Sequence, residues 1–453
     1  MPTKTTAKIA DGADRGEPVV LRAMMTQFGR TGRPIEVDFL KLAGFRSGTD
    51  RATHLLHPYP AKLLLNIPYF FLRCPMVAPK AARLLDPFCG SGTVLLEGRL
   101  AGMEVAGADS NPLARLISSA KSTPLNAATV RQQLDEIVRR SASVAADIPD
   151  VVNRAYWFSD AVSEQLGKLR AAIGLSVTED TRDFYLACFS VCVRKASRAD
   201  PRLSVPVRIN PNRAGIYGAN GAKVIQKFES LDGLDVVEVF RGIVSQNLKR
   251  AELVKWPKGS STRRPDIYHD ARSMPVQDGC FDVVITSPPY VGAQKYIRAS
   301  SLSLGWLGLT PGAKLRIYDV LSIGREHLMH TESASLSKTM CASADTILAS
   351  IQTKNPTRAR IAHRYIQEMT EAIAETHRVI RAGGYLVLVV GPNSIAGHEF
   401  NTPEYLRTVA EQAGFRTRLH LVDHIRSRGL MTKRNKTAGM IAQESVWLFQ
   451  REE

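Results

Sequence analysis

The sequence predicts an α/β fold built on a mostly parallel sheet, and two regions lead to that expectation. In 83–125, short apolar runs end in a polar residue and are followed by a glycine turn or an amphipathic helix, a pattern typical of β-α-β units. A second region begins near 262, where the continuous apolar run 281–286 has the composition of a strand buried on both faces.

The first region predicts a strand at 83–86, a glycine turn, a helix from Thr93, a strand at 104–108 and a second helix from Pro112. From 126 to 261 the pattern changes. Helical periodicity appears in 130–145 and 163–175, and then gives way to 197–223, which is rich in Pro, Gly, Asn and Arg. We therefore expect an inserted, largely helical and irregular region that does not join the sheet.

The C-terminal part predicts a helix over 369–382 that ends at Gly383 and Gly384, followed by a strand at 385–391. A helix over 403–414 and strands at 415–425 and 444–450 follow, and we expect these two strands to be antiparallel neighbours. Residues 1–50 are expected to be a partly disordered lead-in, because the first eighteen residues have no apolar core of a secretory signal.

The composition is typical of a globular protein, and its charge suggests that the protein binds a polyanion. The chain has 453 residues, 44% of them hydrophobic, with 60 Lys and Arg against 43 Asp and Glu, a net charge of +17. Such an excess favours nucleic acid as a partner over solubility alone. No apolar stretch reaches the roughly 20 residues of a membrane span. The six cysteines have no metal-type spacing, so we expect no metal and a reducing cytoplasm.

A glycine motif, DPFCGSGT, occupies 86–93 between the first strand and its helix. Gly90 and Gly92 allow a tight turn and close approach of the backbone to a ligand. Asp109 ends the next strand 23 residues after Asp86, where an acid commonly binds ribose hydroxyls. The loop has no Lys for a phosphate. Its carboxylates suit a cofactor with a positive centre, such as the sulfonium and ammonium of S-adenosylmethionine.

A second motif, TSPPY, occupies 286–290 at the end of the 281–286 strand. Two consecutive prolines fix φ and make the turn rigid. This turn aims Ser287 and the following carbonyls at one point beside Tyr290. Rigid acceptors next to an aromatic ring suit a planar base with an exocyclic amine, whereas a purely structural Pro-Pro turn is the alternative.

These motifs together resemble those of the S-adenosylmethionine-dependent amino-methyltransferases of DNA, and the Ser of TSPPY resembles the type that modifies the N4 amine of cytosine. HPYPAKL (57–63) and HDAR (269–272) match further family segments. The resemblance covers about 50–125 and 265–450 and implies a Rossmann-like, seven-stranded methyltransferase sheet, mostly parallel with an antiparallel C-terminal strand. The long insertion precedes HDAR, a departure from the family's alpha-type arrangement. We expect a catalytic domain of 51–125 and 262–453 and a target-recognition region of 126–261.

The resemblance implies a set of site residues. The catalytic group is Ser287, Pro288, Pro289 and Tyr290. The S-adenosylmethionine-binding group is His57, Tyr59, Pro60, Lys62, Asp86, Phe88, Gly90, Gly92, Thr93, Asp109, Asp270 and Ala271. In the implied mechanism the base flips out of the duplex and stacks on Tyr290, and Ser287 and the Pro288 carbonyl accept hydrogen bonds from the amine, which attacks the methyl group directly.

Two basic clusters are expected to contact DNA phosphates. Arg194–Arg213 holds six basic residues and one acid, and Arg416–Lys436 holds seven and one. A solvated hairpin or loop is the alternative for each cluster. The candidate contacts are Arg194, Lys195, Arg198, Arg202, Arg426, Arg428, Lys433, Arg434 and Lys436.

Three other functions stay open at this point. Adenine N6 methylation needs a similar pocket, and methylation of guanine N2 in RNA uses related motifs, although those enzymes usually carry a sizeable RNA-binding domain upstream. A catalytically inactive DNA-binding defence or regulatory protein is the alternative from another class. The expected partner is double-stranded DNA in a prokaryotic, nucleoid-associated cytoplasmic setting, with a cognate restriction endonuclease or defence component as a further partner.

Overall fold

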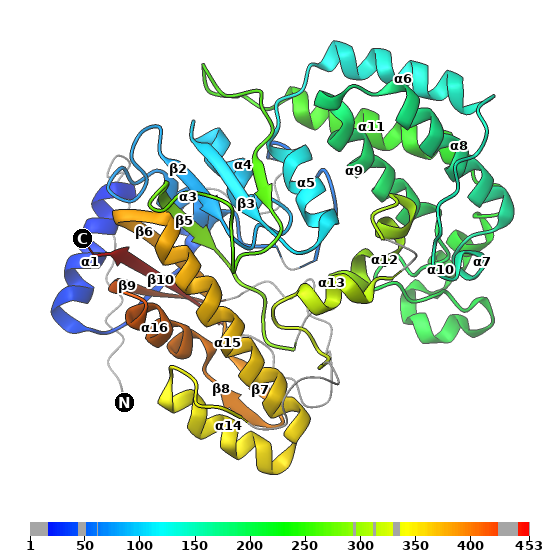
Figure 1. Ribbon diagram of the computed structural model, residues 1–453. Helices are drawn as coiled ribbons and strands as arrows, with labels where there is room; N and C mark the ends of the chain where they lie inside the picture. Colours follow the sequence, from blue (N-terminus) through cyan, green and yellow to red (C-terminus); the bar gives the residue numbers. More distant parts are fainter. Residues whose placement is uncertain are drawn as a thin grey trace.

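A single mixed sheet organises the protein. The computed structural model describes residues 17–43, 51–60, 62–292, 296–310, 314–328, 336–424 and 443–452. In them, eight strands lie in the order β1-β9-β10-β6-β5-β2-β3-β4 (Figure 1). All neighbours are parallel except β10, which is antiparallel to both β6 and β9. The strands are β1 (Ile35–Val37), β2 (Arg83–Asp86), β3 (Glu104–Ala108), β4 (Asp266–Tyr268), β5 (Phe281–Thr286), β6 (Ile380–Val390), β9 (Phe415–His424) and β10 (Gln443–Arg451).

The strand order creates a crevice between β2 and β5. From β2 the chain adds β3 and β4 on one side, whereas β5 returns to pair with β2 on the other side. Ligands of open α/β sheets bind outside the carboxyl ends of the strands at such a reversal. The predicted Rossmann-like sheet with an antiparallel C-terminal strand is confirmed, and β1 adds one strand to the seven expected.

Alternating side chains divide the sheet between two helical layers. Leu84 and Val283 pack with α1, α3 and α4, and their neighbours Leu85 and Val284 pack with α14, α15 and α16 (Figure 1). This period of two is expected for strands with both faces buried. The helices of this part are α1 (Glu17–Thr31), α2 (Phe39–Leu42), α3 (Asn66–Leu72), α4 (Thr93–Leu100), α5 (Pro112–Ser122), α12 (Tyr296–Trp306), α13 (Arg316–Leu321), α14 (Ala342–Lys354), α15 (Pro356–Val379) and α16 (Thr402–Gln412).

A helical region lies beside the sheet between α5 and β4 (Figure 1). Its core joins Phe184, Tyr185 and Phe240 to Trp306 of α12, so the region packs on the rest of the protein through α12 and α5. The sequence prediction of helical and irregular structure outside the sheet agrees with this arrangement. The elements are α6 (Ala127–Ser141), α7 (Arg154–Trp157), α8 (Asp160–Ser176), α9 (Glu179–Ala196), the 3-10 helix η1 (Pro211–Asn220), α10 (Gly221–Glu229) and α11 (Val236–Glu252).

Two details differ from the sequence expectations. Part of the expected lead-in is ordered, because 17–43 forms α1, β1 and α2, and β1 pairs with β9. The helix before β6 ends at Val379, so Gly383 and Gly384 lie inside the strand that follows. A short hairpin of β7 (Asn393–Ile395) and β8 (His398–Phe400) follows β6. Within the described ranges, no helix has the length and apolar character needed to cross a membrane.

Candidate active site

A cleft opens at the carboxyl ends of β2, β3, β4 and β5. About 670 Å³ of space, part of it open to solvent, lies between its walls. Both predicted motifs and HDAR reach it. Its lining residues are Tyr59, Pro87, Phe88, Gly90, Asp109, Ser110, Asn111, His269, Asp270, Ala271, Ser287, Pro289, Tyr296, Leu321, Ser322 and Ile323.

The glycine loop needs its glycines for backbone geometry and for close packing. Gly90 (φ +47°) lies against the Tyr59 ring, and Gly92 has φ +76°. A Cβ on Gly92 would lie 2.7 Å from Cα of Ser118 in α5, so glycine fits here and a larger residue does not. Thr93 begins α4 directly after this turn. The loop is therefore held close to α5, with Phe88 and Gly90 at the cleft.

Asp109 organises the loop through both of its carboxylate oxygens. The Gly90 amide donates to Oδ2 at 3.0 Å, and the Asn111 amide donates to Oδ1 at 2.8 Å. Burial raises the pKa of Asp109 to about 6, against the opposing effect of these two amides and Arg115. The carboxylate at the end of β3 thus fixes the glycine loop and also faces the cleft.

Asp86 connects the glycine motif to TSPPY. Thr286 Oγ1 donates to Asp86 Oδ1 at 2.6 Å, and the Phe88 amide donates to the same oxygen at 3.1 Å. Asp86 and Thr286 are both almost fully buried, and desolvation raises the pKa of Asp86 to about 7. This predicted cofactor residue does not line the cleft. It couples the two loops that do.

The second motif divides into residues at the cleft and residues behind it. Ser287 and Pro289 line the cleft, whereas Pro288 is buried and Tyr290 is absent from the lining. The Tyr290 hydroxyl donates to Glu444 Oε1 of β10 at 2.9 Å. Burial beside this carboxyl raises the pKa of Tyr290 well above its usual range. The motif's aromatic ring is therefore anchored to the C-terminal strand.

Asp270 and Ala271 reach the cleft, as predicted for HDAR. The Arg272 guanidinium donates to both Asp270 oxygens, from Nε at 2.9 Å and from Nη2 at 2.7 Å, and lowers the pKa of that carboxyl below its ordinary value. Arg272 also pairs with the buried Glu368 of α15 at 3.3 Å. Asp270 is thus a fixed, ionised acceptor at the cleft wall.

The HPYPAKL segment contributes Tyr59 to the cleft, and its other predicted members serve the surrounding structure. His57 Nε2 lies 2.9 Å from Ser190 Oγ of α9, and burial lowers the pKa of His57 to about 3. Lys62 Nζ donates to the backbone carbonyls of His57 and His54. Pro60, which is half-buried, is also outside the lining.

In the basic cluster Arg194–Arg213, some side chains are bonded within the protein and others are exposed. Arg194 donates to the backbone carbonyls of Asp200 and Leu203, and Arg202 donates to both carboxylate oxygens of Asp200. Arg198 is half-buried and Lys195 is exposed. The C-terminal candidates lie outside the described residues and stay predictions: Arg426, Arg428, Lys433, Arg434 and Lys436.

Sequence reasoning missed several cleft residues, of which Asn111 is the clearest. Its side chain accepts from Leu113 N as the N-cap of α5, and Nδ2 donates to the Tyr59 hydroxyl at 3.1 Å and to Ser300 Oγ at 3.0 Å. The sequence Asn-Pro directly after Asp109 and Ser110 is a helix-start signal that could have identified it. Tyr296, Ser322 and Ile323 come from segments with no comparable local signal.

Two comparisons of sequence found methyltransferases. Residues 58–152 match the model of the RMKL-like methyltransferase domain family, a stretch that includes Tyr59, the glycine loop and Asp109. The Type II methyltransferase M.MvaI of Kocuria varians is 25% identical over 372 residues, which cover 78% of this chain and 80% of that protein. The findings support a methyltransferase with S-adenosylmethionine as its cofactor.

A comparison with solved structures also found similar chains, at 10% identity. A TehB-like S-adenosylmethionine-dependent methyltransferase from Corynebacterium glutamicum covers 95% of this chain and 100% of its own, with a TM-score of 0.27. The rRNA methyltransferase aviRa from Streptomyces viridochromogenes covers 90% of this chain and 94% of its own, with a TM-score of 0.28.

The residues at the cleft fit this cofactor. The glycine loop brings Phe88 and Gly90 to the cleft beside the Tyr59 ring, and Asp109 adds a carboxylate there. Asp270 of HDAR supplies a second carboxylate. Carboxylates favour a ligand that carries a sulfonium and an ammonium. The cleft between the glycine loop and Ser287 is therefore the candidate site of methyl transfer.

Proposed function

We propose that the protein is a DNA methyltransferase that transfers a methyl group from S-adenosylmethionine to the N4 amine of cytosine. The observation that carries the proposal is the position of Ser287 and Pro289, which line the same cleft as Gly90 and Asp109. The Asp86–Thr286 hydrogen bond holds the two loops in this arrangement. The name of the Kocuria varians relative, a Type II methyltransferase, supports DNA as the substrate.

In the proposed reaction the target base leaves the duplex and enters the cleft. Ser287 Oγ and the Pro288 carbonyl accept hydrogen bonds from the exocyclic amine, which localises the nitrogen lone pair and directs it into the cleft. S-adenosylmethionine supplies an electrophilic methyl group on its sulfonium. Because the proline pair fixes the turn, Ser287 is held in place before the substrate arrives, and positioning provides much of the rate enhancement.

Tyr290 is outside the cleft lining but directly follows Pro289, which lines it, and in this proposal its ring provides the stacking surface for the flipped base. Its hydroxyl is held by Glu444, so the ring has one orientation relative to the turn. Stacking of a base on an aromatic side chain contributes about 1–3 kcal/mol. A fixed ring also loses less conformational freedom when the base binds.

We assign 51–125 and 262–453 to catalysis and 126–261 to recognition of the target sequence. The net charge of +17 supports binding to duplex DNA, and with it an association with the nucleoid. A restriction or defence role requires a nuclease with the same target. It predicts that DNA modified by this protein resists that nuclease.

Single-molecule sequencing of plasmid DNA from cells that express the protein tests the proposal. We expect N4-methylcytosine within one short sequence motif, and no such signal with the Ser287→Ala variant at equal expression. N6-methyladenine in the motif would support the adenine alternative. Unmodified DNA from cells that contain folded wild-type protein would contradict the assignment to DNA.

A further inference from the structure

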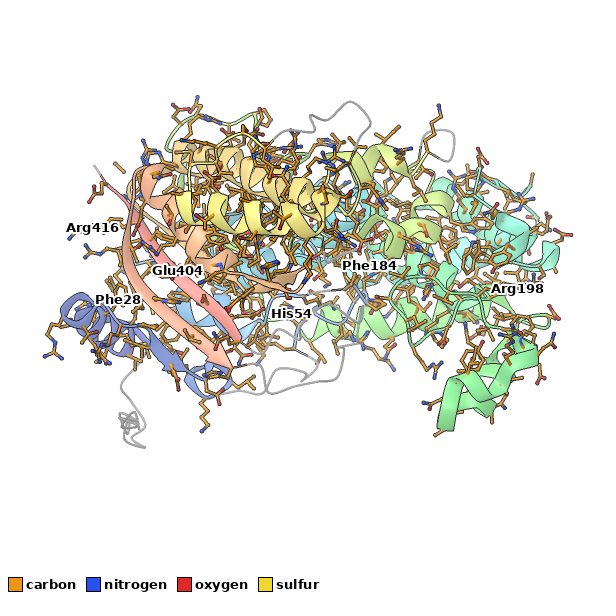
Figure 2. The ribbon with its side chains drawn as sticks, turned by 90° about the horizontal axis from the view of Figure 1, so that it is seen from below. Phe28, His54, Phe184, Arg198, Glu404 and Arg416 are labelled. Carbon is orange, nitrogen blue, oxygen red and sulfur yellow. The ribbon has the colours of Figure 1, made fainter. Side chains whose placement is uncertain are left out.

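A small lobe, residues 197–230, projects from the helical region. It contains η1 and α10 around a core of its own, formed by Ile209, Tyr217 and Val224. Figure 2 shows these two helices, in green, extending away from the body below the labelled Arg198. We call residues 197–230 the η1 lobe.

Several of the lobe's basic side chains form hydrogen bonds and ion pairs inside the lobe. Lys227 Nζ donates to the carbonyls of Ser197 and Ala199 at 3.0 and 3.1 Å. Arg202 donates to the Tyr217 carbonyl at 3.0 Å while it pairs with Asp200. These bonds hold η1 and α10 against residues 197–202. The lobe is joined to the body by Arg194 of α9, which donates to the carbonyls of Asp200 and Leu203, and by Arg198, which donates to the Ala155 carbonyl of α7.

The segment 210–220 is exposed in spite of this anchoring, since Tyr217 is its one buried residue. The Tyr217 hydroxyl accepts from the Asn210 amide, and Asn210 Oδ1 accepts from the Asn212 amide at 3.1 Å. The segment is therefore folded by its own hydrogen bonds. The side chains of Asn212, Arg213 and Ile216 are on the outside, and Ile216 is 64% exposed.

These outward side chains are of the kinds that read base edges. Arginine pairs in a bidentate manner with guanine, asparagine with adenine, and alkyl groups contact the thymine methyl. Among the described residues, the Arg213 side chain makes no hydrogen bond or ion pair, in contrast to those of Arg194 and Arg202. Within the η1 lobe, six Lys or Arg residues face two acids, a balance that complements the phosphate backbone.

We propose that segment 210–220 enters the major groove and reads the target sequence, with Arg213 as a specificity-determining residue. This inference rests on the proposed function and adds the element that selects the site. The hydrogen bonds from Arg194 and Arg198 fix the lobe on α9 and α7, and the helical region in turn packs on α12. A fixed position is what sets the number of base pairs between the bases that are read and the base that is flipped.

Arg213→Ala and Arg213→Lys test this inference, with Arg241→Ala as the matched control. Arg241 is an exposed arginine of α11 in the same helical region, paired with Glu238 at 3.4 Å, so its removal changes the net charge equally. Thermal melting and cofactor binding of all variants should equal those of wild type, because Arg213 contributes to neither the lobe core nor the cleft.

Single-molecule sequencing then reports the methylated motif of each variant. We expect Arg213→Ala to lose roughly tenfold or more of the discrimination at one position of the motif, the usual effect of a bidentate contact. Arg213→Lys should lose part of it, and Arg241→Ala none. A motif and rate for Arg213→Ala equal to those of Arg241→Ala would overturn the role of the lobe and leave the proposed function intact. A wild-type protein that methylates no DNA would overturn both.

Discussion

The buried carboxyl of Asp86 predicts a specific pH dependence of stability. Desolvation raises its pKa in the folded protein to about 7, from 3.8. The folded state therefore keeps this proton to higher pH than the unfolded chain does. As pH rises from about 4 to about 7 the native state binds more protons than the unfolded state, so stability falls through this group and is level above its folded pKa.

Asp86→Asn removes the titrating group and keeps the Oδ1 acceptor that Thr286 and Phe88 use. One pH unit of this linkage is about 1.4 kcal/mol, and from about pH 5.5 to the folded pKa near 7 it amounts to about 2 kcal/mol. The stability of the variant relative to wild type should therefore be about 2 kcal/mol greater at about pH 8.5 than at about pH 5.5.

Urea unfolding of the cofactor-free protein at the two pH values measures this difference. Thr286→Val is the companion variant: it removes the hydroxyl that lowers the Asp86 pKa, so the loss of stability should move to higher pH than in wild type. A relative stability of Asp86→Asn that is the same at both pH values would refute the idea that the Asp86 carboxylate is ionised at a desolvation cost.

Three further predictions concern the cofactor, the base and the DNA. Gly92→Ala, whose Cβ would lie 2.7 Å from Ser118 Cα at φ +76°, should lower stability by about 1–2 kcal/mol or more and weaken cofactor binding in calorimetry; unchanged melting and affinity would contradict the loop geometry. Tyr290→Ala should reduce the single-turnover methylation rate at least about tenfold with the fold intact; an equal rate would remove its stacking role. Neutralising Arg434 and Lys436 together should reduce the slope of log affinity against log salt by up to about 1.8, and an unchanged slope would place the DNA elsewhere.

The sheet and the centre of the site could be predicted because their signals are local. A buried parallel strand is a continuous apolar run, and the residue that follows it must lie at the edge where ligands bind. Asp109 and Ser287 each follow such a run directly, and both line the cleft. The glycines of DPFCGSGT likewise predict a tight turn, and Gly90 and Gly92 have the positive φ that such a turn uses.

Contacts between distant segments could not be predicted in this way. The partner of Tyr290 is Glu444, 154 positions along the chain. The role of each basic residue could not be predicted either. A count of basic residues does not separate a side chain that contacts phosphate from one that, like Arg202, forms hydrogen bonds within the protein. Only the folded arrangement assigns these side chains a role.

Methyl transfer from labelled S-adenosylmethionine by the purified protein tests the central claim most directly. Duplex DNA and RNA are offered separately, and the labelled nucleoside is identified by mass spectrometry after digestion. The account predicts label in DNA, as N4-methylcytosine, and its absence with Ser287→Ala. Label in RNA, or no transfer to either nucleic acid by protein that binds the cofactor, would contradict it.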